Sequence, residues 1–350
     1  MSARVSNFEF RFSTMKAIVI SKSGPPEVMK LADVSEPEVG AKEILVGVKA
    51  AGINFADLFA RQGLYPDAPK PPFTPGLEIS GVIEKVGAGV RELKEGERVM
   101  AIVRSGGYAE KARVAASQAV PVPEGMDFQQ AAALPINYLT AYHMLVYMGN
   151  VRRGERVLIH AAAGGVGIAA IQLCKIAGAE IYGTASAAKF DFLRAQGVQY
   201  PIDYRTQDFE EEVRRLTEGE GVDIVLDAVG GESFQKSYNL LRPAGRLMIF
   251  GFSAAMTGLD RSYLKAAPRF LRIPKFDPLQ MMRENRAVIG VHIGRLKPET
   301  LPEEYVALLQ HFAAGRIRPY IDRTFPLDQA PAAHLYLHER KNLGKVLLIP

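Results

Sequence analysis

Short apolar runs alternate with longer mixed stretches through the middle of the chain. The apolar runs lie at residues 157–160, 181–185, 222–227 and 247–250. Stretches with helical character lie between them, for example at 208–216 and 234–241. Strands that alternate with helices in this way are typical of a parallel sheet covered by helices on both faces. The pattern therefore predicts an α/β fold with a doubly wound parallel sheet.

One connection in this region consists almost entirely of small residues. The strand predicted at 157–160 runs into Ala161-Ala162-Ala163-Gly164-Gly165-Val166-Gly167, and an apolar helix follows over 168–177. Such small residues let the backbone approach a diphosphate closely, and the N–H groups that open the helix face its charge. A tight turn in an unrelated α/β protein is the alternative, and the strands that follow argue against it. We expect a dinucleotide cofactor to contact Ala163, Gly164, Gly165, Val166 and Gly167.

The two ends of the chain are richer in strand-like runs. These lie at residues 15–20, 44–48, 82–86, 96–100 and 107–111, and again at 321–326 and 346–349. Residues 52–81, the proline-rich segment, cannot form regular sheet, and we expect them to line a substrate site. Further helices are expected at 128–133, 136–148, 302–314 and 328–340, a last strand at 288–293, and irregular helical turns at 255–285.

Composition and charge narrow the class of protein. The net charge is +5, but Lys and Arg are scattered, without the basic runs or the interleaved aromatic residues typical of nucleic-acid binding. No apolar run reaches the roughly 18 residues that a membrane span needs, and residues 1–14 lack the apolar core of a secretory signal. The single cysteine, Cys174, excludes disulfides within the chain and favours a cytoplasmic location.

Several strings resemble a known family. The chain is similar to the medium-chain dehydrogenase/reductases, in the zinc-free quinone oxidoreductase (zeta-crystallin-like) group, through Gly154-Glu155, Leu158, Ala162 to Gly165, Gly167, Gln172 and Lys175. Within that group it resembles the vesicle amine transport protein branch. Four strings carry this second resemblance: Asn54-Phe55-Ala56-Asp57-Leu58, Arg61-Gln62-Gly63-Leu64-Tyr65, Pro201-Ile202-Asp203-Tyr204 and Asn342-Leu343-Gly344-Lys345-Val346-Leu347.

The resemblance implies the domain organisation. It implies a GroES-like catalytic domain built from residues 15–135 and 298–350, with a Rossmann domain inserted at 136–297. Residues 1–14 precede the first predicted strand, and we expect them to form a loose extension; a start of the protein at Met15 is the alternative. The resemblance also implies a homodimer that pairs through the edge strand at 288–293.

The resemblance also bears on metal binding. Zinc-dependent members use two Cys and one His for the catalytic ion, but Leu77 stands where that His is expected, in Gly76-Leu77-Glu78. A catalytic zinc site requires three protein ligands. We therefore expect no zinc.

The choice of cofactor depends on the end of the second strand of the predicted sheet. NAD-binding proteins carry Asp or Glu there, whereas this chain has Ser186, which lies 22 positions after Gly164, and then Lys189. Both suit a 2′-phosphate, although Lys189 as an ordinary solvated lysine is an open alternative. Tyr204 resembles the family tyrosine that reaches this phosphate, and Arg205 is a weaker candidate. We expect NADP(H).

Without a metal or a catalytic thiol, the expected chemistry is hydride transfer to a quinone or an α,β-unsaturated carbonyl compound. The resemblance places Asn54 and Asp57 in the cleft, where Asn54 would donate to the developing oxyanion and Asp57 would fix a loop or a water. A turn-stabilising pair is the alternative. Tyr65 would donate a proton or line the pocket. The remaining cofactor contacts expected are Thr140, Phe250, Gly251 and Asn342.

The other titratable residues carry less information. His334 and His338 lie four positions apart on a predicted helix, and we expect them on its surface. Two further functions stay open: an enoyl-thioester or long-chain enal reductase, and a dinucleotide-binding structural or membrane-associated protein without activity.

Overall fold

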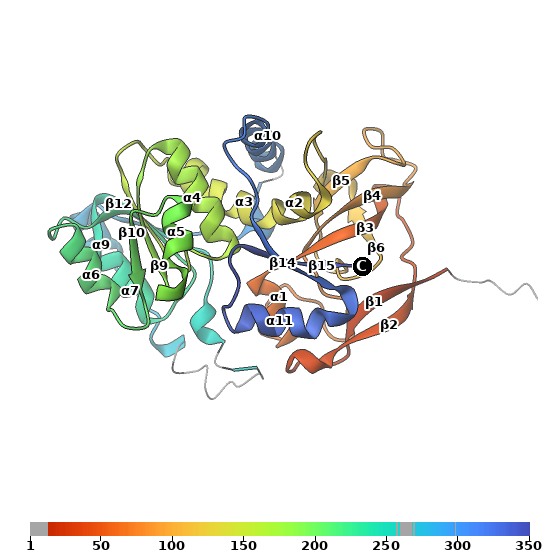
Figure 1. Cartoon of the computed structure of the whole chain (residues 1–350), viewed down its shortest axis with the longest axis horizontal. Coiled ribbons are helices and arrows are strands. Elements are labelled where there is room, and N and C mark those ends of the chain that lie inside the picture. The colour runs from red at the N-terminus through yellow and green to blue at the C-terminus, as the bar shows by residue number, and fades with distance from the viewer. Residues whose placement is uncertain (1–12, 257, 260–267, 269, 298) are drawn as a thin grey trace, which may run out of the picture.

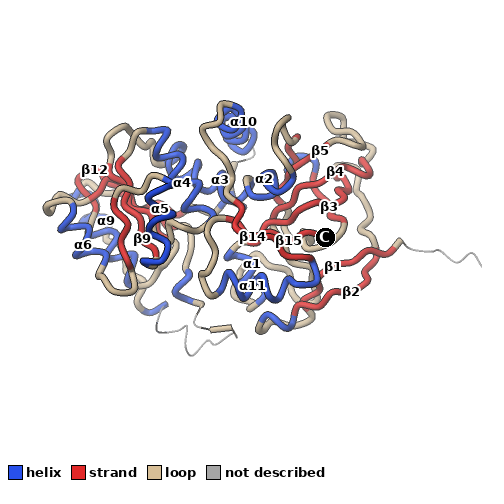
Figure 2. Tube along the Cα trace, in the orientation of Figure 1, coloured by secondary structure: helices blue, strands red, loops and turns tan. Residues whose placement is uncertain are grey.

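The computed structural model describes residues 13–256, 258–259, 268, 270–297 and 299–350. Two sheets stand at opposite ends of the molecule, with helices α2 (Phe128–Ala133), α3 (Pro135–Tyr142) and α10 (Thr300–Ala313) between them (Figure 1). Strands of each sheet run side by side and helices cover the sheet on the left of the view (Figure 2).

The first sheet is parallel and has six strands in the order β10-β9-β8-β11-β12-β13. The strands are β8 (Arg156–Ile159), β9 (Glu180–Ala185), β10 (Tyr200–Asp203), β11 (Val222–Asp227), β12 (Leu241–Ile249) and β13 (Ala287–Gly290). The connecting helices are α4 (Gly165–Ala177), α5 (Phe190–Gln196), α6 (Phe209–Leu216) and α7 (Glu232–Asn239). The direction of the strand order reverses beside β8, and ligands bind outside the carboxyl ends of the strands at such a point. The predicted doubly wound sheet is confirmed.

The second sheet joins both ends of the chain. Its order is β14-β15-β3-β4-β5-β7, and β6 pairs with β3. The bounds are β3 (Glu43–Ile53), β4 (Glu78–Val86), β5 (Arg98–Ile102), β6 (Lys111–Ala115), β7 (Ala119–Pro121), β14 (Ile321–Pro326) and β15 (Lys345–Ile349). Val346 and Leu348 of β15 are buried with Val46 and Val48 of β3 in one core cluster. The C-terminal strands therefore belong to the same sheet as the N-terminal strands.

Smaller elements finish this half of the molecule. β1 (Thr14–Ile20) and β2 (Met29–Ser35) form a separate antiparallel pair. Helix α1 (Phe55–Arg61) opens the proline-rich segment, and α11 (Ala330–His338) packs its apolar face on the same core as β3. Helix α9 (Pro278–Glu284) precedes the edge strand β13.

Some elements differ from the predictions. The edge strand ends at Gly290, so the last three residues of the predicted 288–293 strand lie outside it. The helix expected at 136–148 ends at Tyr142 and continues as a π-helical stretch over His143–Met148. Residues 1–12, and 257, 260–267 and 269 of the segment expected to form irregular turns, lie outside the described residues.

The prediction of a surface position for His334 is wrong. The side chain is fully buried, and its Nε2 lies 3.3 Å from the Tyr108 hydroxyl. Helix α11 packs this face against the β domain, because the apolar residues that flank His334 belong to the core of that domain. Desolvation holds the pKa of His334 well below its ordinary value.

Candidate functional site

A cleft of about 1050 Å³ runs between the two sheets. It lies at the carboxyl ends of the parallel strands and continues along the proline-rich segment. All but two of the site residues named from the sequence line it: Asn54, Tyr65, Thr140, Ala163, Gly164, Gly165, Val166, Gly167, Ser186, Lys189, Tyr204, Phe250, Gly251 and Asn342. The exceptions are Asp57 and Arg205.

The small-residue loop lies against the start of α4. A Cβ on Gly165 would lie 2.3 Å from Nδ2 of Asn137, and one on Gly167 would lie 2.3 Å from the carbonyl oxygen of Ala162. The Gly167 contact is with backbone, so a side chain there would force the loop away from the start of α4, whereas one at Gly165 would displace the Asn137 side chain. The first N–H groups of α4 have no partner within the helix and face the cleft end of the sheet. The loop therefore fits a diphosphate group, which would accept from these N–H groups.

Basic and hydroxyl side chains gather beyond the end of β9. The Lys189 ammonium donates to the carbonyl oxygens of Arg340 at 2.7 Å and Asn342 at 2.6 Å. The Arg340 guanidinium lies over the Tyr204 ring, 5.9 Å from its centroid, and both residues line the cleft with Ser186. Carbonyl groups orient the Lys189 charge without neutralising it, although desolvation lowers the pKa of this lysine. These four side chains, from three separate segments, form an anion-binding corner.

Sequence reasoning missed Arg340 and included Arg205. Arg205 does not line the cleft, whereas Arg340 enters it from the end of α11, in a backbone conformation with φ of 55°. No local pattern around Arg340 points to the end of β9, which is more than a hundred residues away along the chain.

A second group that the sequence did not reveal surrounds His160, directly after β8. Its Nδ1 lies 3.2 Å from the Thr184 hydroxyl and its Nε2 lies 3.1 Å from the Ser237 hydroxyl. The Ser237 hydroxyl in turn donates to Asp227 at 2.7 Å. Burial lowers the pKa of His160, and the negative charge of Asp227 opposes that effect. The imidazole therefore lies among polar side chains of the cleft, at the carboxyl ends of three strands, where burial favours its neutral form.

A buried ion pair lies where the two halves of the cleft meet. The Lys345 ammonium contacts the Glu78 carboxylate and donates to Oδ1 of Asn54 at 2.7 Å. The Asn54 amide donates to the same carboxylate at 2.8 Å, and the other Glu78 oxygen accepts from the backbone N–H of Ile136 at 2.8 Å. Asn54 thus keeps one amide hydrogen uncommitted by these contacts. The pair ties β4, β15 and the start of α3 together at the edge of the cleft.

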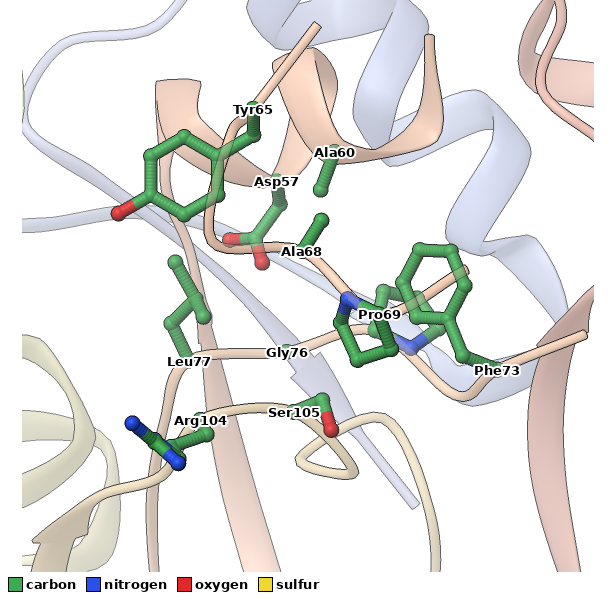
Figure 3. A pocket seen from close by; sticks show the side chains of 11 residues that line it. Asp57, Ala60, Tyr65, Ala68, Pro69, Phe73, Gly76, Leu77, Arg104 and Ser105 are labelled. Carbon is green, nitrogen blue, oxygen red and sulfur yellow. The ribbon is translucent and has the colours of Figure 1, made fainter. Parts of the chain in front are cut away.

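Asp57 stabilises the start of helix α1 and does not line the cleft. Its Oδ2 accepts from the backbone N–H of Asn54 at 2.8 Å, which caps α1. Figure 3 shows Asp57 facing a small hollow beneath Tyr65, with Leu77 and Arg104 on the opposite side. Burial raises the pKa of Asp57 to about 7, and the bond from Asn54 opposes the shift. The carboxyl group therefore fixes the loop that carries Asn54.

Tyr65 contacts His292, a residue that follows the last strand of the parallel sheet. Its hydroxyl lies 3.1 Å from Nε2 of His292, which follows β13, and the two rings are stacked with centroids 6.2 Å apart. Asp67 lies 3.4 Å from the same nitrogen and also pairs with Arg295 at 2.9 Å. These contacts join the proline-rich segment to the end of the parallel sheet across the mouth of the cleft.

Among the described residues, no group of three or more His, Cys, Asp or Glu side chains is arranged to hold a metal ion. No helix of that part of the chain is long and apolar enough to cross a bilayer.

Comparisons with known proteins agree with this architecture. The alcohol dehydrogenase GroES-like domain model matches residues 40–124, and the zinc-binding dehydrogenase model matches residues 165–313. The fold and the cleft at the switch point of the parallel sheet define a medium-chain dehydrogenase/reductase. The chain belongs to that family, in its quinone oxidoreductase group near the vesicle protein branch.

Individual relatives cover nearly the whole chain. The synaptic vesicle membrane protein VAT-1 homolog of Danio rerio is 43% identical over 339 residues, which are 96% of this chain and 70% of the relative. The quinone oxidoreductase of Sus scrofa is 33% identical over 96% of this chain and 98% of the relative. The crystal structure of Escherichia coli quinone oxidoreductase complexed with NADPH has a TM-score of 0.85 and 32% identity, over 96% of this chain and 100% of that chain. The resemblance inferred from the sequence is confirmed.

Proposed function

We propose that this protein is an NADPH-dependent reductase of quinones or α,β-unsaturated carbonyl compounds. The observation that carries the proposal is the anion-binding corner formed by Ser186, Lys189, Tyr204 and Arg340 at the end of β9. NAD-binding proteins place a carboxylate at this point, and a carboxylate would repel a 2′-phosphate. A cationic corner there attracts the phosphate that distinguishes NADPH from NADH.

The remainder of the cleft suits a long dinucleotide and a flat apolar substrate. The loop at Gly164–Gly167 fits the diphosphate, and Thr140, Phe250 and Gly251 lie further along the same cleft. Apolar side chains border the part next to the proline-rich segment, namely Ile53, Phe55, Phe59, Leu64 and Phe252. Apolar walls with a few polar groups are typical of small-molecule sites.

Bound NADPH would supply a hydride to an electron-poor carbon of the substrate. The negative charge that then develops on the substrate oxygen needs a donor or a cation nearby. Asn54 and Lys345 both line the cleft, and Asn54 has an amide hydrogen that its contacts with Glu78 and Lys345 leave uncommitted. We assign Asn54 as the oxyanion donor and Lys345 as the residue that orients its amide.

The cofactor assignment is tested by binding of NADPH and NADH to Lys189→Ala and Arg340→Ala. Each change removes a charged partner of the phosphate, so NADPH should bind about 10- to 100-fold more weakly while NADH binding changes little. Lys30→Ala, at an exposed position on β2, is the control. Equal losses for both cofactors in both variants would refute the phosphate role.

The reaction is tested with a panel of quinones, small enones, long-chain enals and enoyl thioesters, following nicotinamide absorbance. Turnover of quinones or small enones with NADPH is the expected result. Turnover confined to thioesters would identify the substrate class as acyl carriers. Tight NADPH binding without turnover of any compound would instead support a protein that binds the dinucleotide and performs no reaction.

We further propose a homodimer that pairs through β13. This strand ends the six-stranded sheet, and among the described residues no strand pairs with its outer edge, which could therefore accept a second copy. Sedimentation equilibrium should give twice the chain mass. A substitution of Val288 with proline, which removes a ladder donor, should shift the protein to the monomer.

A further inference from the structure

The contact between Tyr65 and His292 crosses the cleft mouth and involves two groups that can exchange a proton. Tyr65 belongs to the proline-rich segment and lines the cleft, half-buried. In Figure 3 its hydroxyl points away from the side of the segment that carries Pro69 and Phe73. His292 also lines the cleft, but its side chain is 42% exposed and therefore reaches solvent.

Asp67, which lies beside Tyr65 and His292, determines where the proton shared by these two residues lies. A hydrogen bond between the Tyr65 hydroxyl and Nε2 of His292, 3.1 Å apart, can run in either direction. Asp67 breaks that symmetry, because its carboxylate oxygen lies 3.4 Å from the same nitrogen and favours a proton there. With the proton on Nε2, the tyrosine oxygen accepts from His292. The tyrosine's own O–H is then free to donate into the cleft.

We propose that His292 is a positioning residue that turns the hydroxyl of Tyr65 towards the substrate, so that Tyr65 delivers the proton that completes the reduction. This inference rests on the proposed function. Tyr65 is the proton donor already expected from the sequence, and the new element is the role of His292, a residue of the parallel-sheet domain, in chemistry that occurs on the proline-rich segment.

The step balances without a further redox partner. After hydride transfer, the O–H bond of Tyr65 breaks and a new O–H or C–H bond forms on the reduced substrate, which changes no oxidation state. Nδ1 of His292 takes up a proton from solvent, which the exposed ring can reach, as the proton on Nε2 passes to the phenolate. The imidazole is then neutral with its proton on Nδ1, and proton exchange with solvent restores the Nε2–H form. The overall reaction consumes one hydride and one proton.

Other charged groups surround the pair. Asp67 and Arg295 form an ion pair beside His292 at 2.9 Å, and Asp57 lies below Tyr65. Burial of Tyr65, together with the charges of Asp67 and Asp57, raises the pKa of its hydroxyl above the ordinary value, whereas Arg295 opposes the shift. The hydroxyl thus stays protonated at neutral pH and is available as a donor, and the N–H of His292 stabilises the phenolate once it forms.

The test compares Tyr65→Phe, His292→Leu and His292→Gln in the full-length protein. Tyr65→Phe and His292→Leu should each lower kcat by about 100-fold, the lower end of what a positioned acid contributes, with KM and NADPH affinity within about twofold. His292→Gln should recover part of the rate, because its amide can donate to Tyr65 in place of Nε2–H and orient the hydroxyl, although it cannot pass a proton to the phenolate. The double variant Tyr65→Phe/His292→Leu should be no slower than the singles, because both remove one function.

Three readouts exclude a merely structural role. The solvent deuterium isotope effect on kcat should change in His292→Leu. The pH profile of kcat in this variant should also lose the ionisation that Tyr65 and His292 contribute in the wild type. Nitrogen-15 NMR of the cofactor-free protein should show the proton of neutral His292 on Nε2, with its signal assigned by its absence from His292→Gln. His311→Gln, on α10, is the matched control.

The outcomes separate the two proposals. If the wild type reduces a quinone or enone but His292→Leu is as fast, or if the proton resides on Nδ1, the role of His292 is wrong and the proposed function stands. If the wild type reduces no member of the panel, the proposed function fails, and the proton transfer fails with it.

Discussion

Replacing Lys345 with methionine removes the cation from a buried ion pair while keeping a side chain of similar length. Lys345 is 3% exposed and Glu78 is fully buried, so the variant leaves a carboxylate that water cannot reach. The donors that remain are the Asn54 amide and the Ile136 N–H, each 2.8 Å away. Loss of one partner of a buried pair costs about 3–5 kcal/mol, mainly because the other charge stays buried.

Chemical denaturation of the wild type and the variants measures this cost. Lys345→Met should lower the free energy of unfolding by about 3–5 kcal/mol. Lys345→Met/Glu78→Gln should recover part of that loss, because the double variant no longer buries an unpaired charge. The matched control is Arg215→Met, which breaks an ion pair with Glu212 at a position where the Arg215 side chain is 67% exposed.

The control should lose about 1 kcal/mol or less, because exposed ion pairs are screened by solvent. The reasoning is refuted if Lys345→Met loses no more than Arg215→Met. It is also refuted if the loss in the double variant equals or exceeds the sum of the losses in Lys345→Met and Glu78→Gln, because additive losses would mean that the two side chains are not coupled.

Three further predictions concern the cleft. Gly167→Ala places a Cβ 2.3 Å from the Ala162 carbonyl oxygen, so it should lower the free energy of unfolding by about 1–3 kcal/mol and weaken NADPH binding. Gly258→Ala is the control, because no described atom lies within 4 Å of the added Cβ. Wild-type affinity for NADPH in Gly167→Ala would contradict the close approach. The pKa of Asp57, raised to about 7 in the folded protein, means that the folded state holds a proton that the unfolded state releases near pH 4. The contribution of Asp57 to stability is therefore present below about pH 4 and is lost by about 1.4 kcal/mol per pH unit up to pH 7, and Asp57→Asn should remove that slope from denaturation curves measured between these values. Asn54→Ala should lower kcat by about 100-fold with NADPH affinity unchanged, as measured by steady-state kinetics and titration, and an unchanged kcat on every active substrate would remove Asn54 from the mechanism.

The fold could be predicted because each element carries its own local signal. The strands β8, β9 and β11 are short apolar runs with Gly or small residues at their ends, and the parallel order follows from the helices between them. The dinucleotide loop was recognisable for the same reason: its chemistry depends on consecutive residues. Boundaries shifted by a few residues where the sheet ended, as at β13.

The parts of the site that the sequence did not reveal depend on contacts between distant segments. Lys345 lies 267 positions from Glu78 along the chain, and His292 lies 227 positions from Tyr65. In the sequence each is one polar residue near an apolar run, and nothing beside it indicates a partner. His334 was predicted to be exposed, but it is buried and contacts Tyr108. Its spacing of four positions from His338 does not distinguish a buried helix face from an exposed one.

The return of β15 to the first sheet has a consequence for biosynthesis. The edge of β3 at Ala51–Ile53 pairs with the final strand, which leaves the ribosome after the entire nucleotide domain. The parallel sheet contains a continuous stretch of chain and can therefore fold first, although it comes second in the sequence. Until the last residues emerge, the nascent protein exposes an unpaired strand edge and the apolar patch that α11 and β15 will cover, so this interval is when chaperones are most needed.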